Sequence, residues 1–154
     1  MSLSIEEQLR QNGFYVSTTV GVSMRPMLRN RRDRVILRAV EDGEHLQKWN
    51  LPLYRTADGR YVLHRIIGHT EDGRYIVRGD NTYQKEYISQ EQMIGVTTEF
   101  YRGKKRVSAD NRAYRRYAAF WNAVYPLRRI CRIPFFLGAR LIKKIRNIHQ
   151  GDTK

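Results

Sequence analysis

Turn residues divide this chain into short segments rich in β-branched and aromatic side chains, and this pattern limits the fold more than any other feature. Two of the turns, Ala57-Asp58-Gly59-Arg60 and Glu71-Asp72-Gly73-Arg74, are typical of β-hairpins, because Asp-Gly readily adopts the positive φ that tight turns need. Short strands at this spacing predict a mainly β fold, either a sheet or a partly open barrel. The expected strands cover residues 14–20, 34–40, 51–56, 61–67, 75–78 and 93–101.

A short helix is expected before the first strand. Ser4-Ile5-Glu6-Glu7 fits a capping box, and Gly13 can end the helix that follows. Residues 1–12 carry acids where a secretory signal has its basic region, and no stretch approaches the roughly 18 uncharged apolar residues of a spanning helix. We therefore expect a chain that is held at a membrane surface as a peripheral protein, or is otherwise cytoplasmic.

Positive charge is concentrated in the C-terminal third of the chain. The formal net charge is +14. Residues 1–101 hold 14 Lys and Arg against 13 Asp and Glu, whereas residues 102–154 hold 15 against two, so nearly all the excess lies in the second part. This shift predicts a β-rich domain over residues 1–102 and a basic amphipathic helical tail over residues 103–154.

The tail interleaves cations with aromatic and aliphatic side chains. Residues 110–125 have helical periodicity, and Leu137, Leu141, Ile145 and Ile148 recur at helical spacing among Lys and Arg. A basic amphipathic helix suits an anionic membrane surface; a helical hairpin packed on the sheet, with a solvated basic face, would show the same pattern. Nucleic acid also attracts such charge, but no helix-turn-helix, zinc ligand pair or RNA-binding signature is visible, so nucleic acid is not an expected partner.

A serine lies in the connection between the first two expected strands, within Gly21-Val22-Ser23-Met24-Arg25-Pro26. A nucleophile needs a fixed hydroxyl and a nearby backbone N–H that can stabilise an oxyanion. Ser23 is the candidate nucleophile, and Gly21, Met24 and Pro26 would frame the oxyanion and substrate site around it. A turn serine that only hydrogen-bonds to its own loop would also explain these residues.

Two other residues are candidates for acid–base roles. His64 lies in the apolar segment 61–67, and its ordinary pKa lets it accept a proton near neutrality. Asp80 follows the strand 75–78 in Gly79-Asp80-Asn81, where a carboxylate can hold an imidazole in one tautomer. Taken separately, the histidine could be a satisfied structural residue and the Asp-Asn pair a turn.

In this order, the segments Ser23-Met24-x-Pro26, His64-Arg65 and Gly79-Asp80-Asn81 resemble the conserved boxes of the signal peptidase superfamily, which includes the self-cleaving LexA-type repressors. Arg32-Asp33-Arg34-Val35-Ile36 resembles its intermediate box. Most bacterial members use lysine as the general base. With His64 at that place, the chain is similar to the endoplasmic-reticulum, archaeal and SipW-like signal peptidases, which use Ser, His and Asp.

The resemblance implies a β-rich serine peptidase that needs no cofactor and acts on a signal or leader peptide at a membrane surface. Ser23 would be the nucleophile, His64 the general base and Asp80 the acid that orients it. Gly21-Val22 stands where the superfamily often has Ser-Gly, so the oxyanion would depend on backbone N–H groups, chiefly that of Ser23.

Two alternatives remain open. The chain could keep this fold as a binding module without useful catalysis, acting through its basic tail on lipid or nucleic acid. It could instead cleave itself, with Ser108-Ala109 as a candidate site. A metal enzyme is not expected, because the four histidines lack ligand spacing and Cys131 is a single cysteine.

Overall fold

A computed structural model describes residues 3–131 of the chain. Its elements follow one another in the order α1 (Ile5–Asn12), β1 (Tyr15–Thr18), β2 (Arg34–Ala39), β3 (Pro52–Arg55), β4 (Tyr61–Leu63), β5 (Arg65–His69), β6 (Tyr75–Arg78), β7 (Glu86–Ile88), η1 (Gln90–Gln92), β8 (Met93–Arg102), β9 (Lys105–Ser108) and α2 (Arg112–Ala123).

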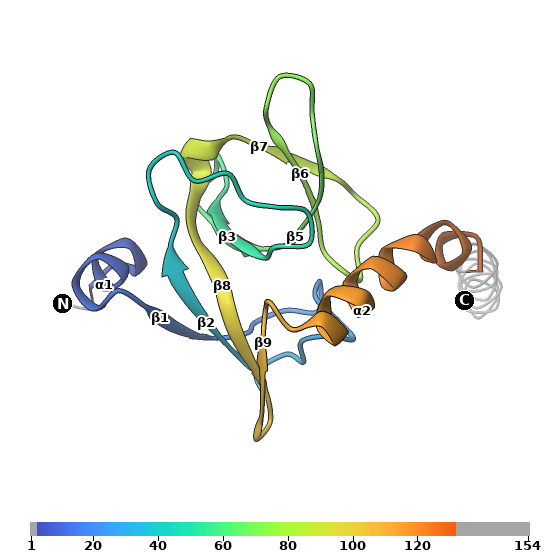
Figure 1. Cartoon of the computed structure of the whole chain (residues 1–154), viewed down its shortest axis with the longest axis horizontal. Coiled ribbons are helices and arrows are strands. Elements are labelled where there is room, and N and C mark those ends of the chain that lie inside the picture. The colour runs from blue at the N-terminus through green and yellow to red at the C-terminus, as the bar shows by residue number, and fades with distance from the viewer. Residues whose placement is uncertain (1–2, 132–154) are drawn as a thin grey trace, which may run out of the picture. The chain divides into compact units, whose positions relative to one another are not determined.

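The described strands form two antiparallel sheets (Figure 1). The larger sheet has the strand order β1-β2-β8-β3-β4, with β9 paired to β8, and it curls into a half-barrel. The smaller sheet has the order β5-β6-β7. This architecture confirms the prediction of a mainly β fold with a short N-terminal helix.

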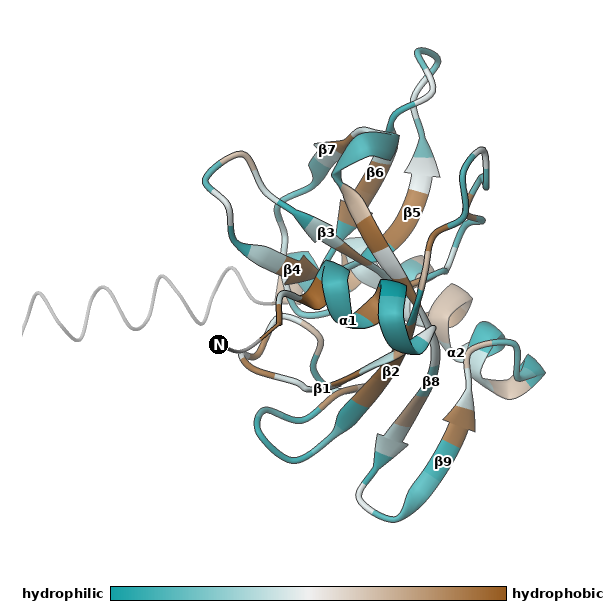
Figure 2. Ribbon diagram, turned by 90° about the vertical axis from the view of Figure 1, so that its left-hand side faces the viewer, coloured by the Kyte–Doolittle hydropathy of each residue, from teal (hydrophilic) through white to brown (hydrophobic). Residues whose placement is uncertain are grey.

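The caps of α1 are those that the sequence predicts. The Ser4 side chain accepts a hydrogen bond from the Glu7 amide at 3.1 Å, and the Glu7 carboxylate accepts one from the Ser4 amide at 2.8 Å. Gly13 ends the helix with a φ of 76°, a conformation that costs glycine little. Figure 2 shows α1 between β4 and β1, and Leu9 is its buried anchor.

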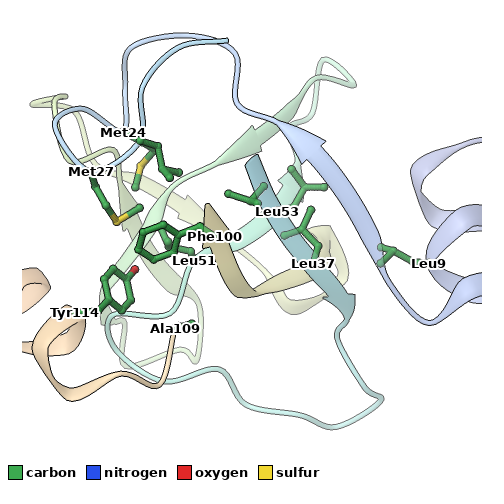
Figure 3. Packing of buried hydrophobic residues seen from close by; sticks show 11 residues of the cluster. Leu9, Met24, Met27, Leu37, Leu51, Leu53, Phe100, Ala109 and Tyr114 are labelled. Carbon is green, nitrogen blue, oxygen red and sulfur yellow. The ribbon is translucent and has the colours of Figure 1, made fainter. Parts of the chain in front are cut away.

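Each sheet packs over its own cluster of buried side chains. The first cluster joins α1, the half-barrel and the start of α2, and its members include Leu9, Leu37, Leu53, Phe100 and Tyr114 (Figure 3). The second cluster joins the smaller sheet to β3 and β8. Its members are Leu46, Tyr54, Ile66, Tyr75, Val77, Ile88 and Val96.

The two predicted hairpin turns are confirmed, and they have the same construction. Thr56 opens the first and Thr70 the second, and each threonine hydroxyl donates to the turn aspartate, Asp58 or Asp72. Each hydroxyl also accepts from the amide of the arginine four residues on, at 3.0 and 2.9 Å. These local bonds fix the register of β3 with β4 and of β5 with β6.

The segment predicted as one strand over residues 61–67 is divided at His64. β4 ends at Leu63 and belongs to the half-barrel, whereas β5 begins at Arg65 and belongs to the smaller sheet. The chain passes from one sheet to the other at this residue. His64 is therefore placed where two sheets meet, and not within a continuous strand.

The first compact unit extends beyond the boundary expected at residue 102. Gly103 has a φ of 62° and turns the chain back, so that β9 pairs with β8. Tyr114 and Ala118 of α2 are buried as well. The chain divides instead into a unit that ends at Ala119 and a second unit that begins at Phe120. The amphipathic pattern expected over residues 137–148 lies outside the described residues.

The predicted tail helix begins at Arg112, because the Asn111 side chain accepts hydrogen bonds from the amides of Ala113 and Tyr114 at 2.9 and 3.2 Å. Between residues 3 and 131, no helix has the length and apolar character needed to cross a bilayer.

Candidate active site

Ser23 lies in the loop between β1 and β2, and buried side chains hold that loop in place. Met24, Met27 and Leu28 point into the first hydrophobic cluster, and Figure 3 shows the two methionines in it. The Leu28 amide donates to the Met24 carbonyl at 2.9 Å, and Gly21 opens the loop with a φ of 99°. Ser23 is left half-buried on a well-anchored backbone.

The segment after β6 holds the backbone of Ser23 from another side. The Asn81 amide donates to the Ser23 carbonyl at 2.7 Å, and the Asn81 side-chain amide donates to the Val22 carbonyl at 3.2 Å. A Cβ added at Gly79 would lie 2.7 Å from the Ser23 carbonyl oxygen. This close approach of two backbones requires glycine at position 79.

The His64 imidazole is buried and hydrogen-bonded on one side. Its Nδ1 lies 2.9 Å from Oε1 of Glu86 and 3.1 Å from the hydroxyl of Tyr54. The Tyr54 hydroxyl donates to the other Glu86 oxygen, Oε2, at 2.9 Å. Tyr54 comes from β3 and Glu86 from β7, so both sheets contribute to the setting of the histidine.

These contacts determine the tautomer of the neutral histidine. The Tyr54 proton is directed to Glu86, so the proton between Nδ1 of His64 and the Glu86 carboxylate belongs to Nδ1. Nε2 then carries the lone pair that a general base needs. Burial lowers the pKa of His64 below its ordinary value, while the charge and hydrogen bond of Glu86, and the charge of Asp80, raise it in part. The imidazole is therefore neutral at pH 7.

Asp80 does not occupy the position at Nδ1 that the sequence predicts. Its two carboxylate oxygens accept from Nε and Nη2 of Arg65, at 2.7 and 2.8 Å. Arg65 also donates to the Tyr114 hydroxyl at 2.8 Å and to the Met27 sulfur at 3.0 Å. The fully buried guanidinium neutralises Asp80 and links its loop to the loop that carries Ser23.

Ser23 and His64 line the same groove, which has a volume of about 660 Å³. Glu86, Thr82, Gly21 and Met24 also line the groove. Pro26 is exposed and follows a cis peptide bond, and it is not among the lining residues. The walls come from residues 17–21 and 60–64. The floor is apolar and is formed by Leu28, Val35, Leu37 and Leu53.

The sequence pointed to Ser23 and His64 as candidates, and the structure brings both into one groove, but it did not point to Glu86 or Tyr54. Glu86 begins a three-residue strand that was not expected, and Tyr54 has the ordinary appearance of a strand residue. Neither has a local motif, because their roles depend on tertiary contacts with His64. In the sequence, the only indication of Glu86 was that it is an acidic residue shortly after Gly79-Asp80-Asn81.

Within residues 3–131, no three His, Cys, Asp or Glu side chains come together as metal ligands would. Comparison with known proteins assigns no family to the chain, since neither a family model nor a curated protein matches it.

Proposed function

We propose that this chain is a serine endopeptidase with Ser23 as nucleophile and His64 as general base. The observation that carries the proposal is the pairing of His64 Nδ1 with Glu86, in a groove that Ser23 also lines. The pairing leaves the imidazole neutral, with its proton on Nδ1 and a lone pair on Nε2. This is the state that a general base in acyl transfer needs. A histidine with only a structural role would not need hydrogen bonds to both a carboxylate and a tyrosine while it also lines an open groove.

The reaction is acyl transfer to the serine followed by hydrolysis. Nε2 of His64 takes the proton of the Ser23 hydroxyl as Oγ attacks the peptide carbonyl carbon. The protonated imidazole then gives this proton to the leaving amine nitrogen, and the C–N bond breaks. Water attacks the resulting ester in the same way, which releases the acid and restores the serine hydroxyl.

Glu86, not Asp80, is the carboxylate that stabilises the imidazolium in this mechanism. Its oxygen lies in hydrogen-bond contact with Nδ1, and Tyr54 fixes its orientation from the other oxygen. Asp80 acts indirectly, because its ion pair with Arg65 braces the loop whose Asn81 holds the Ser23 carbonyl. The oxyanion would be stabilised by backbone N–H groups, chiefly that of Ser23.

The substrate is an extended peptide that pairs with the walls of the groove. β1 and β4 are the two end strands of the half-barrel, and both line the groove. Thr19 is hydrogen-bonded to Asp33 opposite it, and Thr56 to Arg60. In an antiparallel pair of strands, residues that bond to the partner strand alternate with residues whose N–H and C=O point away from it. Thr18 in β1 and Leu63 in β4 are of the second kind, so their backbone groups point away from β2 and β3. A signal or leader peptide, with small residues before the cut, is the proposed class.

Attachment to an anionic membrane surface is part of this proposal. In the described part of the second unit, Phe120, Leu127 and Ile130 have exposed fractions of 64%, 62% and 63%. Arginines accompany them, and the Arg128 guanidinium lies 3.6 Å from the centre of the Trp121 ring. Exposed apolar side chains among cations are typical of helices that lie in a lipid interface.

Labelling by a serine-directed acylating probe tests the catalytic part of the proposal. We expect the wild-type protein to be labelled and to cut peptides, and Ser23→Ala and His64→Ala to do neither. Ser17→Ala is the matched control, because Ser17 lines the same groove and should be dispensable. A folded wild-type protein that is neither labelled nor able to cut would favour the binding module instead.

Vesicle flotation tests the membrane part. The triple variant Phe120→Ser, Leu127→Ser, Ile130→Ser should lose binding to vesicles that contain phosphatidylserine. Leu3→Ser with Tyr87→Ser removes exposed apolar side chains elsewhere and should leave binding unchanged. Equal flotation of the triple variant and the wild type would refute attachment through these side chains.

A further inference from the structure

The candidate groove has two different ends. Ser23 follows the wall strand β1, His64 follows the wall strand β4, and Glu86 contacts His64. Ile5 of α1 also lines the groove, and it belongs to the helix that precedes β1. β1 leads from α1 toward Ser23, and β4 leads from Tyr61 toward His64. The starts of both wall strands therefore lie toward the helix, and their ends lie toward the catalytic residues.

Contacts with both walls keep α1 at this end. The Tyr61 hydroxyl, at the start of β4, donates to the Glu6 carboxylate, whose two oxygens both lie 3.0 Å away. On the other side, Ile5 and Tyr15 pack against the same buried cluster as Leu9. Figure 2 shows the helix between β4 and β1, and Figure 1 shows it at the end of β1 remote from the loop that follows.

We propose that α1 is a stop that limits how many substrate residues can pair with the groove on one side of the scissile bond. This inference rests on the proposed peptidase function. Tyr61, which contacts the helix, is the first residue of β4 and lies three positions before His64 in the chain. An extended peptide advances by about 3.3 Å per residue, as β4 itself does, so about three substrate residues fit before the chain meets Ile5.

A longer substrate must leave the groove at α1. Its further residues gain no hydrogen bonds from β1 or β4, because the helix lies across their path. Ile5 and Glu6 therefore act as specificity-determining residues, although neither touches the reacting atoms. The preferred substrate is a peptide whose segment on this side of the cut is extended for about three residues and then turns away.

Two series of peptides test this inference. They share one cleavable core, and one series is lengthened only before the cut, the other only after it. In the wild type, kcat/KM should rise with each added residue on one side and stop rising after about three. In Ile5→Ala with Glu6→Ala, the rise should continue, by about three- to tenfold for the next residue, the worth of one further hydrogen bond.

Gln11→Ala is the control, because Gln11 is exposed on the same helix. Its length dependence should match that of the wild type. Circular dichroism establishes that each variant keeps its fold. A wild-type rate that continues to rise on both sides, or an identical limit in the double variant and the wild type, would overturn the inference.

Binding to Ser23→Ala separates the two proposals. This variant should bind the lengthened peptides with the same limit, since binding needs the groove but not the nucleophile. Cleavage without any length limit overturns the role of α1 and leaves the peptidase intact. Length-limited binding by a protein that never cuts refutes the peptidase and supports the stop. A protein that neither binds nor cuts any peptide overturns both.

Discussion

Oε1 of Glu86 lies 2.9 Å from Nδ1 of His64. Glu86 begins β7 in the smaller sheet, whereas His64 follows β4 of the half-barrel, so the contact crosses the junction of the two sheets. It gives the imidazole a fixed tautomer and a counter-charge. In the proposed mechanism, this contact also stabilises the imidazolium that forms when Ser23 is deprotonated.

Replacement of Glu86 by glutamine should impair catalysis with little effect on folding. We expect kcat/KM to fall by about 10²- to 10⁴-fold, because the imidazolium loses its counter-charge. Glu71→Gln, at the exposed tip of a hairpin, is the matched control and should retain full activity. Peptide cleavage measures the effect. Full activity of Glu86→Gln would show that another group orients His64.

The pH dependence of kcat/KM should reflect the buried state of His64. The base must be neutral, so activity is lost as the pH falls through its pKa. Burial lowers this pKa, and we expect the acid limb to have its midpoint below 6.5, the ordinary value for histidine. Glu86→Gln should move the limb lower still, because Glu86 raises the pKa in part. A midpoint above 6.5 would contradict the assignment of His64 as the base.

Loss of one partner of the Arg65–Asp80 ion pair should destabilise the fold. Both side chains are buried, so Arg65→Met leaves an uncompensated carboxylate at a cost of about 3–5 kcal/mol in the free energy of unfolding. Arg65→Met with Asp80→Leu should recover much of this loss, since no buried charge remains. Urea unfolding measures both. Equal stabilities of the single and double variants would show that the pair is not the cause.

Gly79→Ala should displace Ser23. The new Cβ would lie 2.7 Å from the Ser23 carbonyl oxygen, so one backbone must move, at a cost of about 1–3 kcal/mol in stability. Probe labelling of Ser23 should fall sharply. Gly68→Ala is the control, because its Cβ would meet only Ile76 at an ordinary 3.7 Å. Normal labelling of Gly79→Ala would mean that the serine loop tolerates the shift.

Features with local causes could be predicted from the sequence. The capping box of α1, its glycine end and both hairpins depend on side chains within a few residues of one another, and all of them are confirmed. Ser23 and His64 could be selected as candidates because each belongs to a short recognisable segment. Their presence in one groove was beyond local reasoning, since it depends on how β1 and β4 are positioned by the rest of the half-barrel.

Features with tertiary causes were missed. The apolar segment 61–67 gives no sign that the chain changes sheets at His64, because both halves have strand composition. β7 owes its existence to pairing with β6, and β9 to pairing with β8 through the turn at Gly103. Glu86 was overlooked for the same reason. Asp80 was assigned to His64 because the sequence cannot reveal that Arg65 turns inward and takes both of its oxygens.

The half-barrel leaves β1 and β4 as end strands on either side of the groove. An unfilled strand edge is also a template for a second copy of the same chain, which is a common route to aggregation. The net charge of +14 keeps copies apart. Because added salt screens this repulsion, self-association should increase with ionic strength. A bound peptide that covers both edges should oppose it, and would thus keep the protein in solution as well as occupy its groove.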